Sequence, residues 1–248
     1  MTPVSGLHFG SCLDLKCGLP ALEDRSVDHV ITDPPYAPSV LKNARSLGHN
    51  GDKVKVHEFG YGSLYARTRR RVAIEIARVV RRWAIVFCNV EIAHLWAKDL
   101  EDGGLRYVRT GIWVRTNGAP QFTGDRPSVG YEACVIAHVK ERMRWKGGGR
   151  PAVWSHPIVN GRDGTRIHTT PKPLGLMEML VRQFTDRGEL VCDPFAGSAT
   201  TGVACLRGGR AFVGWEKNRS FYEAAAARLA GCREQLEIPL AAAGGELS

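Results

Sequence analysis

A carboxylate, two prolines and an aromatic ring follow one another at Asp33, Pro34, Pro35 and Tyr36, directly after the apolar run Val27–Thr32. The prolines fix φ near about −65° and carry no N–H group, so this stretch of backbone is stiff. The Asp33 carboxylate and the Pro34 carbonyl can accept both hydrogens of an amine, while Tyr36 stacks on a flat base. Because a displacement reaction depends mostly on proximity and alignment, these residues suit methyl transfer to an exocyclic amine of a nucleobase.

The same four residues also have an ordinary structural interpretation. A proline pair often ends a strand, and an aspartate before proline favours a turn. Taken alone, the motif therefore leaves a catalytic site and a strand-ending turn equally open.

A second motif lies near the other end of the chain and reads Asp193-Pro194-Phe195-Ala196-Gly197-Ser198-Ala199-Thr200-Thr201-Gly202. It follows a short apolar strand and leads into a helix, where small residues allow close approach of a ligand and the helix N-terminus favours an anionic group. Glu216 ends the next expected strand, at the place where an acidic residue binds ribose hydroxyls. The pattern predicts a nucleoside-containing cofactor.

Three interpretations of this second motif remain open from its residues. Gly197, Ala199 and Gly202 loosely match a dinucleotide fingerprint, which would indicate NAD. Pro194 and Phe195 are not needed by a pyrophosphate and favour an apolar or cationic ligand such as a sulfonium. A plain strand–loop–helix connection is the third interpretation.

Together the two motifs resemble the β class of amino (N6-adenine or N4-cytosine) DNA methyltransferases, which use S-adenosylmethionine. The catalytic motif comes first and the cofactor motif last, as in that class, and the segment His168–Pro173 resembles its His-x-x-x-Lys-Pro element. The resemblance implies that the target base leaves the duplex to meet Asp33–Tyr36. It also implies cofactor contacts from eight residues: Lys172, Asp193, Phe195, Gly197, Ser198, Thr200, Glu216 and Asn218. In this assignment Ser198, Thr200 and Lys172 lie near the methionine carboxylate.

The resemblance favours adenine N6 as the acceptor, because Asp rather than Ser heads the first motif. Cytosine N4 remains the alternative, and no Pro-Cys pair is present for carbon-5 methylation. Three further classes of protein stay open: a catalytically weak nucleic-acid-binding module, an RNA or protein-amide methyltransferase, and an NAD oxidoreductase.

The chain departs from the family pattern at two places. Ser11 and Cys12 follow the first strand where an acidic residue is common, and Asp14 substitutes poorly by spacing. Ala199 stands where a third glycine is typical. Because alanine disfavours positive φ, we expect a slightly altered loop there.

Composition limits the class of protein. The 248 residues carry a formal net charge of +9, which favours a polyanionic partner, here double-stranded DNA. The seven cysteines show no metal-binding spacing and predict free thiols in the reducing cytoplasm. No apolar run is long enough for a membrane span. We therefore expect no metal and no membrane association; a second copy of the chain is a candidate partner.

Alternating strand and helix patterns predict an α/β fold, the Rossmann-like methyltransferase fold with a mainly parallel sheet and helices on both faces. Strands are expected at Val27–Thr32, Ala84–Asn89, Leu190–Asp193 and Ala211–Trp215, and helices at Leu64–Val80, Val90–Leu100, Lys172–Thr185, Ala199–Arg207 and Phe221–Leu236. Arg106–Arg115 and Glu132–Val139 should form an antiparallel ribbon at the sheet edge. The expected single domain divides into a catalytic half (1–116), an inserted segment (117–166), a cofactor half (167–237) and a frayed tail (238–248).

Two basic segments are candidates for DNA contact. Between Lys42 and Arg82 there are eleven Lys or Arg and three Asp or Glu, and residues 37–62 could close over the base. From this segment we expect Arg67, Arg69 and Arg70 to meet phosphate; the solvated face of a helix is the alternative. The inserted segment supplies Gln121, Arg126 and Arg144 as candidate contacts to bases or phosphates, unless it is a plain surface loop.

Overall fold

The computed structural model describes residues 5–35, 66–159 and 171–237. Its centre is one eight-stranded sheet with the strand order β1-β8-β7-β2-β3-β5-β4-β6. The strands are β1 (Gly6–Phe9), β2 (His29–Thr32), β3 (Trp83–Cys88), β4 (Arg106–Arg115), β5 (Tyr131–His138), β6 (Val153–His156), β7 (Leu190–Asp193) and β8 (Ala211–Glu216). The expected α/β fold with a mainly parallel sheet is confirmed.

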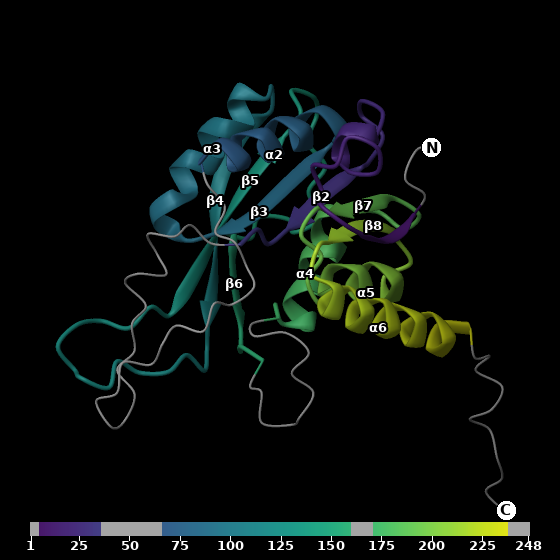
Figure 1. Cartoon of the computed structure of the whole chain (residues 1–248). Helices are drawn as coiled ribbons and strands as arrows, with labels where there is room; N and C mark the ends of the chain where they lie inside the picture. Colours follow the sequence, from purple (N-terminus) through teal and green to yellow (C-terminus); the bar gives the residue numbers. More distant parts are fainter. Residues whose placement is uncertain (1–4, 36–65, 160–170, 238–248) are drawn as a thin grey trace, which may run out of the picture.

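Helices cover both faces of this sheet (Figure 1). On one side lie α2 (Ala66–Val79) and α3 (Ala93–Asp102), and on the other lie α4 (Leu174–Phe184), α5 (Thr200–Arg207) and α6 (Arg219–Glu237). Two short 3-10 helices, η1 (Leu19–Ala21) and η2 (Val90–Ile92), complete the described elements. The helix expected at Val90–Leu100 is therefore split into η2 and α3.

Side chains of β3 alternate between the two apolar cores. Ala84, Val86 and Cys88 pack with α2 and α3, whereas Ile85 and Phe87 pack with α4 and α5. Every residue of β3 is buried, because a central strand of a three-layer fold has no solvent-facing side. This explains its uninterrupted apolar sequence.

The antiparallel ribbon is present, but its predicted location at the sheet edge is wrong. β5 pairs with β3 and with β4, and β6 then pairs in parallel with the outer side of β4. The edge strand β6 comes from the later part of the inserted segment, at Val153–His156, where the sequence pattern predicts no strand. Trp154 fixes β6 in place against α4. Its side chain is buried, and its indole N–H donates to Gln183 Oε1 of α4 at 2.8 Å.

No helix among the described residues is long and apolar enough to cross a membrane. In the same ranges, no group of three or more His, Cys, Asp or Glu side chains could hold a metal ion. All seven cysteines are free.

Candidate active site

The two sequence motifs lie side by side at the carboxyl ends of neighbouring strands in the middle of the sheet. Strands β2, β7 and β8 are parallel neighbours, so their carboxyl ends meet there. A hydrogen bond connects the ends of β2 and β7, since the Thr32 hydroxyl donates to Asp193 Oδ1 at 2.7 Å. Asp33 follows Thr32 directly and therefore lies next to the loop that begins at Asp193.

The Asp33 carboxylate has one bound oxygen and one open oxygen. Lys172 Nζ donates to Asp33 Oδ2 at 2.7 Å. Oδ1 is buried and has no hydrogen-bond partner among the described residues. Burial raises the pKa of this carboxyl, and the Lys172 ammonium opposes part of the rise. Oδ1 is thus an acceptor that is free to bind a donor from a substrate.

Lys172 joins two carboxylates rather than one. Its ammonium also lies 2.8 Å from Glu132 Oε2 of β5, and Glu132 in turn pairs with Arg115 at the end of β4. The ammonium sits 5.0 Å from the centre of the Phe87 ring, a distance typical of a cation–π contact. The Lys172 side chain is 8% exposed. Charge therefore alternates along Arg115, Glu132, Lys172 and Asp33.

This arrangement differs from the expectation that Lys172 lies near the methionine carboxylate, because its ammonium is held by Asp33 and Glu132. Sequence reasoning did not identify Glu132 or Arg115 as part of the site. The signal was a single acidic residue at the start of the otherwise apolar stretch Glu132–Ala137, which is buried throughout. A buried carboxylate requires a partner, and here that partner comes from a segment about forty residues away.

Asp193 organises the second motif from within. Its Oδ1 accepts from Thr32 Oγ1 at 2.7 Å and from the Phe195 N–H at 3.1 Å, and its Oδ2 accepts from Thr201 Oγ1 at 2.7 Å. Burial raises the pKa of this carboxyl to about 6. Both carboxylate oxygens accept hydrogen bonds from the protein itself, so Asp193 supports the loop. The sequence assigned Asp193 a cofactor contact, whereas the contacts in this structure are to protein groups.

The loop makes two left-handed backbone turns. Gly197 has φ of 53° and Ala199 has φ of 57° with ψ of 35°. We expected alanine to disfavour positive φ at this position, and Ala199 nevertheless adopts the left-handed conformation. That conformation costs a non-glycine residue about 1–2 kcal/mol. The surrounding fold holds it in place, since Ala199 is fully buried and its N–H donates to the Ala196 carbonyl at 2.7 Å.

Glu216 at the end of β8 is held by backbone donors. Gly197 N–H donates to Oε2 at 3.1 Å and Asn218 N–H donates to Oε1 at 2.7 Å. The residue is 7% exposed, and burial raises the pKa of its carboxyl. Each oxygen keeps a further lone pair for a hydroxyl donor. The Asn218 side-chain oxygen accepts the Phe221 N–H at 3.3 Å, so it caps the start of α6, and it also accepts from Ser220 Oγ at 2.7 Å.

A cation from α6 reaches the same loop. Arg228 Nη1 donates to the Ser198 carbonyl at 3.0 Å and to Thr200 Oγ1 at 3.1 Å. Ser198 Oγ and Thr200 Oγ1 also lie 3.2 Å apart. Sequence reasoning gave Arg228 no role, because one basic residue on a long helix carries no local signal. Its guanidinium places positive charge beside the two hydroxyl residues expected near the methionine carboxylate.

These residues fit S-adenosylmethionine. The buried Glu216 carboxylate suits ribose hydroxyls, and the partly buried Phe195 ring lies in the same loop. Ser198, Thr200 and Arg228 supply donors and charge for a carboxylate. All of these groups surround the end of β7 and β8, next to the open oxygen of Asp33.

The predicted DNA contacts fall into three groups. Arg67 and Arg70 are exposed on α2, whereas Arg69 is largely buried and its Nε donates to Asp99 Oδ2 of α3 at 2.7 Å. The inserted segment carries Gln121, whose amide donates to Thr123 Oγ1, and the exposed Arg126, which pairs with Asp125. Arg144 lies at the amino end of β3, where its carbonyl accepts from the Trp83 indole at 2.8 Å. The fold thus places Arg144 at the amino end of β3, whereas Asp33 follows the carboxyl end of β2.

Tyr36, the segment 37–62, the residues His168–Thr170 and the tail 238–248 lie outside the described residues. Asp14, the poor substitute for an acidic residue after β1, accepts from the N–H groups of Lys16 and Cys17 in an exposed turn.

Residues 27–227 match the family model of the DNA methylases, N6_N4_Mtase. The chain belongs to this DNA methylase family. The methylase also resembles the type II methyltransferase M2.MboI from Moraxella bovis, with 23% identity over 235 residues, which are 88% of this chain and 84% of the relative.

Two solved structures share the fold of this methylase. The M1.HpyAVI–SAM complex has a TM-score of 0.66 at 24% identity and covers 92% of this chain and 99% of its own. A cytosine-N4-specific PvuII DNA methyltransferase has a TM-score of 0.67 at 16% identity, with coverages of 95% and 93%. The family and its cofactor, predicted from the two motifs, are confirmed. The protein is an S-adenosylmethionine-dependent DNA methyltransferase of the N6-adenine or N4-cytosine type.

Proposed function

We propose that this methyltransferase modifies N6 of adenine in double-stranded DNA. The observation that carries the proposal is the open Asp33 Oδ1, a buried acceptor at the carboxyl end of β2 with no partner among the described residues. An exocyclic amine supplies the donor that this oxygen lacks. An aspartate at the head of the motif favours adenine over cytosine.

Each residue has a distinct task in this proposal. Asp33 Oδ1 accepts one amine hydrogen and the Pro34 carbonyl accepts the other, which directs the nitrogen lone pair toward the methyl donor. Pro35 keeps the turn stiff, and Tyr36 stacks on the base. Lys172 holds Asp33 Oδ2 in place and favours the ionised carboxylate. After methylation the nitrogen must lose one proton, and Asp33 Oδ1 is the nearest base to receive it.

When bound, S-adenosylmethionine supplies the electrophilic methyl group. Glu216 would bind its ribose, Phe195 would pack near the sulfonium, and Ser198, Thr200 and Arg228 would bind its carboxylate. Gly197 shapes the loop, while Asp193 and Asn218 act by holding the loop and Glu216. Enclosing the reacting groups between these residues excludes water and fixes their alignment.

DNA would approach the edge of the sheet that carries Asp33. The exposed Arg67 and Arg70 of α2, together with Gln121 and Arg126 of the inserted segment, are our proposed contacts to the duplex. The proposal also assigns the protein to the cytoplasm, because its substrate is cellular DNA and its seven cysteines are free.

Nucleoside analysis tests the proposal directly. Genomic DNA without methylated adenine or cytosine is incubated with the protein and labelled S-adenosylmethionine, then digested and separated by mass spectrometry. We expect N6-methyladenine; N4-methylcytosine as the only product would exclude adenine as the target. Asp33→Asn should lose methylation while keeping cofactor affinity. Asp24→Asn is the matched control, since this carboxylate is 75% exposed and pairs with Arg78.

A further inference from the structure

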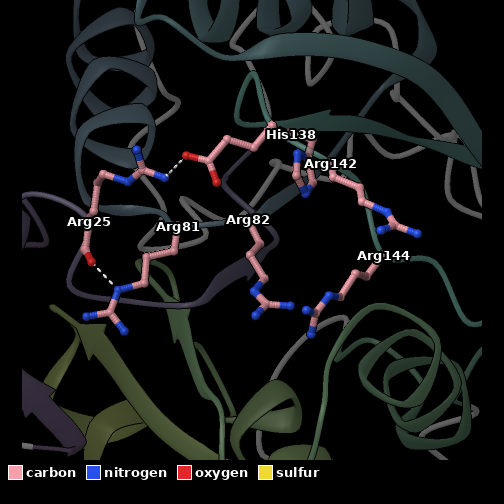
Figure 2. A pocket seen from close by; sticks show the side chains of 7 residues that line it. Arg25, Arg81, Arg82, His138, Arg142 and Arg144 are labelled. Atoms are coloured by element: carbon pink, nitrogen blue, oxygen red, sulfur yellow. Dashed lines mark hydrogen bonds and ion pairs between the residues drawn. The ribbon is translucent and has the colours of Figure 1, made fainter.

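A charged cavity lies at the amino ends of the parallel strands β2 and β3, at the opposite end of these strands from the active site. Its volume is about 410 Å³, and it is lined by Arg25, Arg81, Arg82, His138, Glu141, Arg142 and Arg144. Figure 2 shows these side chains arranged around one opening. They come from the loop before β2, the turn between α2 and β3, the end of β5 and the segment after it. The size falls in the range of small-ligand sites, which span about 300–1,000 Å³.

This cavity cannot be part of the site around Asp33. Arg82 directly precedes β3, and the pairing of Val30 with Ala84 puts it level with Asp28 on the neighbouring strand. Five residues of strand separate Asp28 from Asp33, which corresponds to roughly 17 Å at about 3.3 Å per residue. A base bound at Asp33 would therefore not reach the cavity.

The carboxylates near the cavity do not balance its arginines. Arg25 pairs with Glu141, Arg81 Nη1 lies 3.4 Å from Asp28 Oδ1, and Arg82 Nη1 lies 3.5 Å from Glu189 Oε1. Glu189 is already shared, because its Oε2 lies 2.7 Å from His29 Nε2 and accepts the Asp186 N–H at 2.6 Å.

Arg142 and Arg144 have no ion-pair partner within the described ranges. Both side chains are exposed. Two guanidinium groups without an ion pair thus face a cavity that already holds three paired ones. The Asp186 carboxylate attracts Arg144 electrostatically, but it already pairs with Lys146. Guanidinium groups bind phosphate oxygens in a bidentate manner, so an anion with several phosphates would satisfy more than one of them at once.

A buried polar atom points to the same conclusion. His138 lines the cavity, is 1% exposed, and has an Nε2 atom without a hydrogen-bond partner in the described part of the chain. Its Nδ1 lies 2.6 Å from the Val139 carbonyl oxygen and therefore carries a proton. Nε2 remains available to accept from a phosphate hydroxyl, since burial lowers the pKa of this imidazole and favours its neutral form.

We propose that this cavity binds an anion carrying consecutive phosphate groups. The shared chemistry has two sources, a free polyphosphate chain such as that of a nucleotide, or the backbone of a second DNA segment that runs past the amino ends of the strands. The site is independent of methyl transfer at Asp33.

Thermal unfolding of the full chain with sodium tripolyphosphate tests the proposal at constant ionic strength. A ligand at about one hundred times its Kd should raise the melting temperature of a protein this size by roughly 5–10 °C. The double variant Arg142→Ser/Arg144→Ser should lose at least half of the shift. Arg233→Ser on α6, an exposed arginine outside the cavity, should keep it. An equal shift in the double variant and the wild type would overturn the proposal.

Binding of a 20-base-pair duplex across a salt series separates the two sources. Each lost phosphate contact lowers the slope of log K against log salt by about 0.9. If the tripolyphosphate shift is lost and this slope falls by about one to two relative to Arg233→Ser, the DNA backbone is a ligand of the cavity. If the shift is lost and the slope is unchanged, the ligand is a free polyphosphate. The Arg142 and Arg144 side chains form no ion pair within the described fold. We therefore expect the double variant without ligand to melt at about the wild-type temperature, and this comparison is the folding control.

Discussion

Replacing Lys172 by methionine should shift the pH dependence of methyl transfer. Methionine keeps the apolar stem against Phe87 but removes the ammonium that lies 2.7 Å from Asp33 Oδ2. Burial already raises the pKa of Asp33, and Lys172 opposes that rise. Without the ammonium the pKa of Asp33 rises further, so the reactive carboxylate form is lost at a higher pH.

The size of the shift follows from Coulomb's law. Two unit charges about 4 Å apart interact by about 4 kcal/mol at an effective dielectric constant of about 20. Asp33 is 30% exposed and Lys172 also serves Glu132, so we reduce this value by roughly half. The remaining ~2 kcal/mol corresponds to a rise of about one to two pKa units.

Single-turnover transfer of labelled methyl groups at saturating cofactor, measured from pH 5.5 to 9.5, reports this pKa. The acidic limb of the profile should move upward by about one to two pH units, while the rate on the alkaline plateau stays within a few-fold of wild type. Lys172→Arg should restore most of the limb. Lys98→Met is the matched control, because this lysine is 69% exposed and pairs with Asp102 on α3.

The Kd for S-adenosylmethionine separates this role from the one expected from the sequence. If Lys172 acts on Asp33, the Kd of Lys172→Met should stay within about threefold of wild type. A Kd weakened tenfold or more, with an unchanged acidic limb, would refute our reasoning and assign Lys172 to the methionine carboxylate.

Three further predictions concern stability and reactivity. Burial raises the pKa of Asp193 from its ordinary 3.8 to about 6, so its contribution to stability is present below about pH 4 and is lost as the pH rises through 6. Urea unfolding should therefore show the free-energy difference between wild type and Asp193→Asn changing by up to about 3 kcal/mol between pH 4 and 7, and a constant difference would contradict the raised pKa. Ala199→Val should destabilise the fold by more than about 2 kcal/mol in the same assay, because a β-branched residue is strained at positive φ in a fully buried position; an unchanged stability would mean that the turn is not left-handed. In the native protein a thiol reagent should modify Cys17 alone, since the other six cysteines are buried, and reaction of any thiol in native Cys17→Ser would contradict that burial.

Most strands could be predicted because their signals are local. Leu190–Asp193 begins and ends as expected, and the strands at β2, β3 and β8 differ from the prediction by one or two residues. Each is a short apolar run closed by an acidic residue, a proline or an amide. β6 could not be predicted, because only four residues form it and its pairing depends on Trp154 meeting α4.

The sequence by itself determined the motif order, the fold class and the carboxylate at the head of the catalytic motif, since all three are properties of short contiguous stretches. The tertiary structure decided which charges face that carboxylate. Lys172 meets Asp33 from 139 positions away, and Glu132 joins them only because β5 lies beside β3 in the sheet. The tertiary structure also brings five arginines together around the cavity at the amino ends of β2 and β3. Strand order controls such contacts, and residue spacing along the chain does not encode it.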